Sequence, residues 1–108
     1  MIINSNLFSE CWCPCEGIAR VCLSGSNGIP EDLEKIGKKI DGDEYDPSCF
    51  SIDVIVNDGD NLGATVNYMG INEFYTIGIC DNVDDVMDYY MKHADKDSIN
   101  ETLGKEVN

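Results

Sequence analysis

Four of the six cysteines stand close together near the beginning of the 108-residue chain. They are Cys11, Cys13, Cys15 and Cys22. Four thiolates can hold zinc or copper(I), although the C-x-C-x-C spacing differs from the paired knuckles of structural zinc sites. Thiols that pack as small hydrophobic groups are the other interpretation, and the sequence favours it. A metal-responsive or redox-responsive role for these four cysteines is kept as an alternative.

Carboxylates form the second set of residues with chemical potential. Asp81, Asp84, Asp85 and Asp88 recur at three- and four-residue spacing, and residues so spaced are neighbours on a helix surface. Acids on the preceding strands and turns would widen this ridge into a negative surface: Asp53, Asp58, Asp60 and Glu73. Such a surface can take the place of phosphates in a basic groove and so compete with nucleic acid. An ordinary solvated helix face is the alternative.

Catalytic and calcium-binding patterns are not recognised. A cysteine nucleophile needs a neighbouring base, and His93 is the single histidine. The chain has no G-x-S-x-G, P-loop or G-x-G-x-x-G motif. An EF-hand loop counted from Asp41 would place Tyr45, Asp46 and Ile52 at its fifth, sixth and twelfth positions, where it needs an oxygen ligand, Gly and Glu. We therefore expect neither enzymatic activity nor a bound metal or cofactor.

Alternating apolar residues predict the strands that must position these groups. The stretches 49–56, 62–69 and 73–80 alternate and are separated by turns at 57–61 and around Gly70, which is typical of an antiparallel meander. Residues 17–24 predict a further short strand. The apolar positions expected to share a face are Phe50, Ile52, Val54 and Val56; Leu62, Ala64, Val66 and Tyr68; Tyr75, Ile77 and Ile79; and Ala19, Val21 and Leu23.

Two helices are predicted beside these strands. Residues 30–41 begin with Pro-Glu-Asp and end with lysines, as suits the helix dipole. Residues 82–94 carry a 3.6-residue apolar period, with Asp81 as the expected cap. The polar segment 95–108 has capping-box spacing at Ser98 and Glu101, which allows a short helix.

The predicted fold is a single α+β domain over residues 1–108. It has a three- to four-stranded, mainly antiparallel sheet with helices on one face and an αβββα core. The chain divides into a Cys-rich segment (1–16), the α+β core (17–94) and a polar tail (95–108).

Net charge narrows the classes of partner. Twenty-one acids against seven bases give a formal charge of −14, which opposes binding to nucleic acid or anionic membrane and favours a basic partner. The sequence has no apolar run long enough for a transmembrane helix and no secretory signal at its start, so we expect a cytoplasmic protein with reduced thiols.

The order of elements over residues 30–94 is shared with double-stranded RNA-binding domains, but those need a basic second helix and this one is acidic. In size, charge and element order the chain resembles small phage-encoded anti-CRISPR proteins, some of which occupy the DNA-binding cleft of a Cas nuclease. The resemblance includes no residue motif. It implies a non-enzymatic inhibitor in the host cytosol that binds a CRISPR nuclease or similar defence enzyme and mimics nucleic acid. An immunity protein that neutralises a basic toxin nuclease is an alternative.

Overall fold

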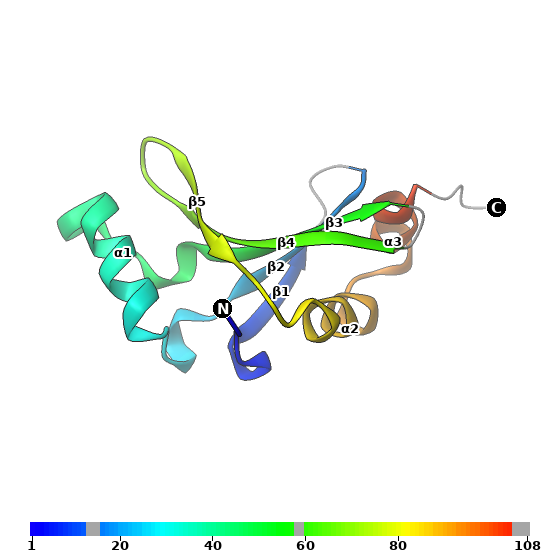
Figure 1. Ribbon diagram of the computed structural model, residues 1–108, viewed down its shortest axis with the longest axis horizontal. Coiled ribbons are helices and arrows are strands. Elements are labelled where there is room, and N and C mark those ends of the chain that lie inside the picture. Colours follow the sequence, from blue (N-terminus) through cyan, green and yellow to red (C-terminus); the bar gives the residue numbers. More distant parts are fainter. Residues whose placement is uncertain (13–15, 58–59, 105–108) are drawn as a thin grey trace.

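A computed structural model of the chain describes residues 1–12, 16–57 and 60–104. Within these residues, five strands form one antiparallel sheet in the order β1-β2-β3-β4-β5, so each strand pairs with its neighbours in sequence (Figure 1). The strands are β1 (Phe8–Trp12), β2 (Ile18–Leu23), β3 (Phe50–Asn57), β4 (Asp60–Met69) and β5 (Phe74–Ile79). The α-helices are α1 (Glu31–Asp41), α2 (Val83–His93) and α3 (Lys96–Leu103), and short 3-10 helices span Ser5–Leu7, Gly25–Asn27, Gly42–Glu44 and Pro47–Cys49.

The α+β class and the αβββα order are confirmed, and the predicted number of strands is corrected from three or four to five. The strand not predicted is β1, which lies at the sheet edge and pairs only with β2. An edge strand buries little of its surface, and in β1 only Phe8 is fully buried. Its sequence therefore lacks the clear alternation by which the central strands were predicted.

The hydrophobic core lies on one face of the sheet. Alternate residues of the central strands fill it, as predicted: Ala19, Val21 and Leu23; Phe50, Ile52, Val54 and Val56; Ala64, Val66 and Tyr68. Val86 and Tyr90 of α2 and Leu33 of α1 also belong to this core. Each fully buried Val, Leu, Ile or Phe side chain stabilises the fold by about 1.5–3 kcal/mol relative to an exposed one.

Two β-bulges change the predicted alternation. Leu62 is the extra residue of β4 opposite the step from Ile55 to Val56, and it is 64% exposed. Ile77 is the extra residue of β5 opposite the step from Val66 to Asn67. A bulge moves every later residue of its strand to the other face, and Ile79 is therefore paired with Thr65 away from the core, 68% exposed. The prediction that Leu62 and Ile79 share the core face was wrong.

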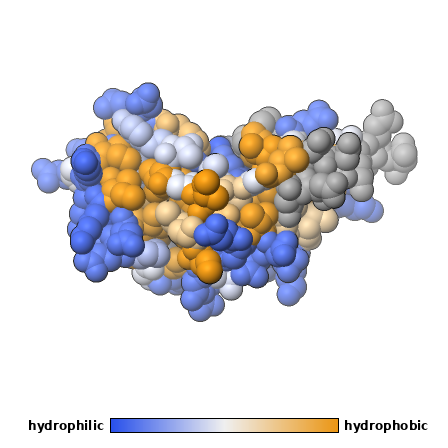
Figure 2. Space-filling view, viewed as in Figure 1, coloured by the Kyte–Doolittle hydropathy of each residue, from blue (hydrophilic) through white to orange (hydrophobic). Residues whose placement is uncertain are grey.

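The helices occupy different parts of the molecule, which measures 47 × 26 × 22 Å. α1 lies at one end of the long axis of the molecule and α3 lies near the other end. α2 lies between α3 and the middle of the molecule (Figure 1). Residues of α2 contact β1 to β4, and residues of α3 contact β2 and β3. The Tyr90 hydroxyl of α2 lies 2.6 Å from the Thr102 hydroxyl of α3, in the protein interior, and joins the two helices. Figure 2 shows patches of hydrophobic residues over the middle of one side of the molecule and hydrophilic residues at its α1 end.

Helix capping differs from the prediction at two places. Asp95, not Ser98, caps α3, because its carboxylate accepts a hydrogen bond from the Ser98 amide at 2.7 Å. The residue that precedes α2 is Asn82, and the Asp81 carboxylate instead accepts from the α-amino group of Met1 at 2.6 Å. Among the described helices, none has both the length and the apolar character needed to cross a membrane.

Candidate partner-binding site

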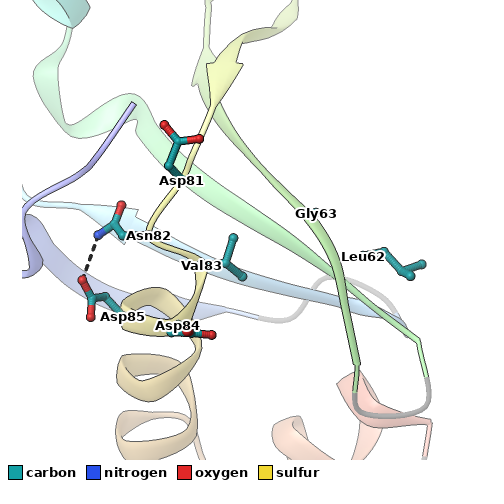
Figure 3. Close-up of a pocket in the computed structure, with 7 residues that line it drawn as sticks. All are labelled: Leu62, Gly63, Asp81, Asn82, Val83, Asp84 and Asp85. Carbon is teal, nitrogen blue, oxygen red and sulfur yellow. Dashed lines mark hydrogen bonds between the residues drawn. The ribbon is translucent and has the colours of Figure 1, made fainter.

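The chain between β5 and α2 is held by Asn82. Its side-chain amide donates to the carbonyl of Ile3 at 2.7 Å, and its oxygen accepts from the Ile3 amide at 2.9 Å. Residues 1–3 therefore run beside the start of α2. The same Asn82 amide nitrogen also donates to the Asp85 carboxylate at 3.1 Å (Figure 3). These hydrogen bonds fix the position of the first turn of α2 relative to the sheet. They therefore also fix the positions of the acids on that turn.

Two open depressions border the acidic residues of α2. The first, of about 520 Å³, is lined by Asp81, Asp84 and Asp85 together with Leu62, Gly63, Asn82 and Val83. In Figure 3, Asn82 points toward Asp85, whereas Leu62 extends from the bulge of β4. The second depression is lined by Asp85, Asp88, Ser5, Tyr89, Met91, Lys92 and His93. Asp85 borders both depressions, so the four acids lie along one continuous surface.

The predicted site residues are only partly brought together. Asp81, Asp84, Asp85 and Asp88 are all exposed on the segment that enters and forms α2, and we call them the acidic ridge. Asp60 is the first residue of β4, two positions before Leu62, and Asp58 lies outside the described residues. Glu73 lies in the β4–β5 turn, at the end of β5 remote from α2. Among the side chains that the structure describes, the broad negative surface predicted from all these acids is therefore limited to the acidic ridge.

The acids of the ridge differ in what surrounds them. Asp81 is paired with the Met1 amine, so part of its charge is already balanced. Asp84 and Asp85 lie in the first turn of α2, where the positive end of the helix dipole stabilises them by about 0.3–1 kcal/mol each. Asp84 and Asp88 form no ion pair within the described residues. Lys92 and His93 occupy the last turn, so the charge of α2 changes sign along its length.

The cysteines that the structure describes do not form a cluster. Cys11 pairs with Val21 on the core face, and its thiol lies 3.8 Å from the carbonyl oxygen of Tyr89. Cys22 pairs with Ser51 on the opposite face. Burial raises the pKa of the Cys11 thiol to about 11 and also raises that of Cys22, so both are protonated at neutral pH. Cys13 and Cys15 lie outside the described residues, and the metal hypothesis stays a prediction.

Sequence reasoning missed a cluster on the sheet face opposite the core. Arg20 and Asp53 form an ion pair there, with Nε–Oδ1 and Nη2–Oδ2 distances of 2.7 and 2.9 Å. The guanidinium lies 5.4 Å from the Trp12 ring centre and 5.2 Å from that of Phe74. One signal was present: Arg20 is the single arginine of the chain and stands inside an apolar strand.

No group of three or more His, Cys, Asp or Glu side chains that could hold a metal ion occurs in the ranges that the structure describes. The acidic ridge is exposed and open to a large partner. Comparisons of the chain with protein-family models, with curated proteins and with solved structures found no match.

Proposed function

We propose that this protein is a non-enzymatic inhibitor that binds a basic nucleic-acid-binding protein and competes with its nucleic acid. The partner class is a CRISPR nuclease or a similar defence enzyme, whose nucleic-acid channel is lined with lysine and arginine. The acidic ridge on α2 supports this proposal most directly.

The exposure of the acidic ridge and the spacing of its carboxylates support the proposal. Asp81, Asp84, Asp85 and Asp88 are exposed, and within α2 the spacing of Asp84 and Asp85 from Asp88 puts their Cβ atoms about 5–6 Å from that of Asp88. Like charges at this spacing destabilise a helix by about 0.2–0.5 kcal/mol per pair. A basic groove would relieve that repulsion, and the net charge of −14 would speed the encounter of the two proteins.

The apolar surface beside the ridge supports the same proposal. Leu62 is placed at the edge of the first depression by the β4 bulge, and Met91 borders the second. An interface needs a desolvated apolar centre as well as charge, because exposed charge pairs add little affinity in water. Leu62 and Met91 would supply such contacts next to the carboxylates.

The test is capture of the partner followed by competition. The full chain, tagged at its C-terminal end so that the Met1 amine remains free to bind Asp81, is used to capture proteins from a bacterial lysate. The expected result is a nucleic-acid-binding protein whose retention falls as salt is raised and which added nucleic acid displaces. Capture of a toxin nuclease would favour the immunity alternative. Retention that nucleic acid and salt leave unchanged would contradict the proposal.

A charge-reversed variant tests the surface itself. Asp84→Lys, Asp85→Lys and Asp88→Lys together should abolish capture while the circular dichroism spectrum stays that of the folded protein. The matched control reverses the exposed acids Asp32, Asp43 and Glu44 at the α1 end, which changes the net charge equally. Equal loss of capture in both triple variants would show that total charge, and not the acidic ridge, determines binding.

A further inference from the structure

The sheet face opposite α2 and α3 carries a band of paired residues across all five strands. Direct pairing places Trp12, Arg20, Asp53, Thr65 and Ile79 side by side, from β1 to β5. Arg20, Asp53 and Thr65 each stand between two core residues of their strand, so the band lies on the face opposite the core. We call this surface the open face. Its other strand residues include Ile55, Met69 and Phe74, which are exposed, and Ser51 and Asn67, which are buried at 6% and 1% exposure.

Large apolar side chains are exposed on the open face. Trp12, Ile55, Met69, Phe74 and Ile79 are between 39% and 68% exposed. Scattered apolar residues are normal on a protein surface, whereas several gathered on one sheet face are typical of an interaction site. Ile79 belongs to this group only because of the bulge at Ile77, so the bulge itself increases the apolar surface.

The open face is nearly uncharged in a chain of net charge −14. The charges of Arg20 and Asp53 cancel in their ion pair, and both side chains are largely buried, at 14% and 13% exposure. Among the strand residues whose side chains the structure describes, Glu10, which pairs with Cys22 at the β1 edge, is the other charged residue on this face. A basic partner would find few carboxylates here to match its cations, because most of them lie on α1, on the acidic ridge and in the loops.

We propose that a second copy of this chain covers the open face and forms a symmetric dimer, sheet against sheet. Two copies of a strongly acidic chain repel each other least through a surface that carries little net charge, and the open face is such a surface. The symmetry is twofold, since the same patch serves both copies. The exposed apolar residues of the open face would form the contact: Trp12, Ile55, Met69, Phe74 and Ile79.

The geometry of this dimer keeps the acidic ridges apart. Packed sheets lie about 10 Å from each other, and a helix layer adds about 10 Å on each outer side. The α2 helices of the two copies would therefore be roughly 30 Å apart, well beyond the Debye length of about 8 Å at physiological salt. Repulsion between the ridges is then screened, and both ridges remain accessible to a partner.

Sedimentation velocity over a wide range of protein concentration tests the proposal. The 11.9 kDa chain is expected to double in mass as concentration rises. Trp12 is the single tryptophan and lies on the open face, so its emission should shift to shorter wavelength at the same concentrations. Added salt should leave the dimer unchanged or strengthen it, opposite to its effect on binding at the acidic ridge. A chain that stays monomeric at every concentration would overturn the proposal.

Variants identify the surface. Ile55→Glu and Ile79→Glu, made separately, should each weaken dimerisation by at least about 100-fold, because each buries an unpaired charge in both copies. The controls Leu62→Glu and Met91→Glu add the same charge at exposed apolar residues that border the depressions beside α2, and they should leave the dimer intact. Circular dichroism checks that each variant folds. If Ile79→Glu fails to fold, Ile55→Glu alone tests the surface. A dimer that survives both Ile55→Glu and Ile79→Glu forms through another surface, which would also overturn the proposal.

Discussion

Arg20 and Asp53, on adjacent strands, are directly paired in register and joined by two hydrogen bonds on the open face. The flat guanidinium matches the carboxylate at two points, which is the strongest geometry for such a pair. The rings of Trp12 and Phe74 lie near the guanidinium and add cation–π attraction. This arrangement connects β1, β2, β3 and β5 through one side chain.

Removing one partner of this ion pair should be more damaging than removing both. Arg20→Ala leaves the Asp53 carboxylate largely buried without its cation and should lower the free energy of unfolding by about 3–5 kcal/mol. The double variant Arg20→Met with Asp53→Leu leaves no charge and replaces both groups with apolar side chains, so its stability should lie closer to that of the original chain than that of Arg20→Ala does. Urea denaturation of the three proteins measures this. Equal losses in the single and double variants would mean that the pair stabilises the fold by its charge.

Gly37 should resist replacement by alanine, although alanine normally stabilises a helix by about 1 kcal/mol over glycine. A Cβ atom at this position of α1 would overlap the ring of Tyr45 and lie 3.1 Å from Phe50 Cζ. Overpacking of this kind costs about 1–3 kcal/mol, so Gly37→Ala should be destabilising on balance. Thermal denaturation is the measurement, and Lys39→Ala, at an exposed position on the same helix, is the control. A rise in melting temperature for Gly37→Ala would contradict the close packing of α1 against Tyr45.

Acid should weaken α3 through its cap. Hydrogen bonds from the Ser98 amide and side chain hold the pKa of the Asp95 carboxyl below its ordinary value. A carboxyl whose pKa is lower in the folded state stabilises that state above the unfolded pKa of about 3.9, and the effect is lost as pH falls through the folded value. Asp95→Asn keeps a capping side chain that does not titrate. Denaturation at pH 6 and below pH 3 measures the stability of both proteins. In acid the original protein should lose more stability than Asp95→Asn does. A difference that does not change with pH would show that Asp95 does not cap α3 as an anion.

The Cys11 thiol should react slowly at neutral pH. Burial raises its pKa to about 11, and the nearby Cys22 adds to the rise. Because only the thiolate reacts with iodoacetamide, alkylation of Cys11 at pH 7.5 should be slower than that of free cysteine and should accelerate up to about pH 11. Mass spectrometry of fragmented peptides assigns the modified cysteine. Fast alkylation at pH 7.5 that zinc suppresses would instead favour the metal-binding alternative.

Much of this protein could be predicted because local patterns determine it. The alternation of 49–56 and 62–69 predicts β3 and β4, and the 3.6-residue period of 82–94 predicts α2, since these periods follow from backbone geometry alone. The spacing of Asp84, Asp85 and Asp88 likewise determines that they share one side of α2. The sequence of β1 has no such period, which is why the fifth strand was not predicted.

The tertiary structure decided what depends on contacts between distant residues. Leu62 and Ile79 follow the alternation in the sequence but are exposed, because each bulge is defined only by the register with a neighbouring strand. The pairing of Arg20 with Asp53 depends in the same way on the register of β2 with β3, across 33 positions of chain. The sequence by itself determined the helices and the central strands, the negative charge and the spacing of the acidic ridge. Only the folded sheet decided that a nearly uncharged open face with exposed apolar residues lies opposite the core, because faces exist only once strands have paired.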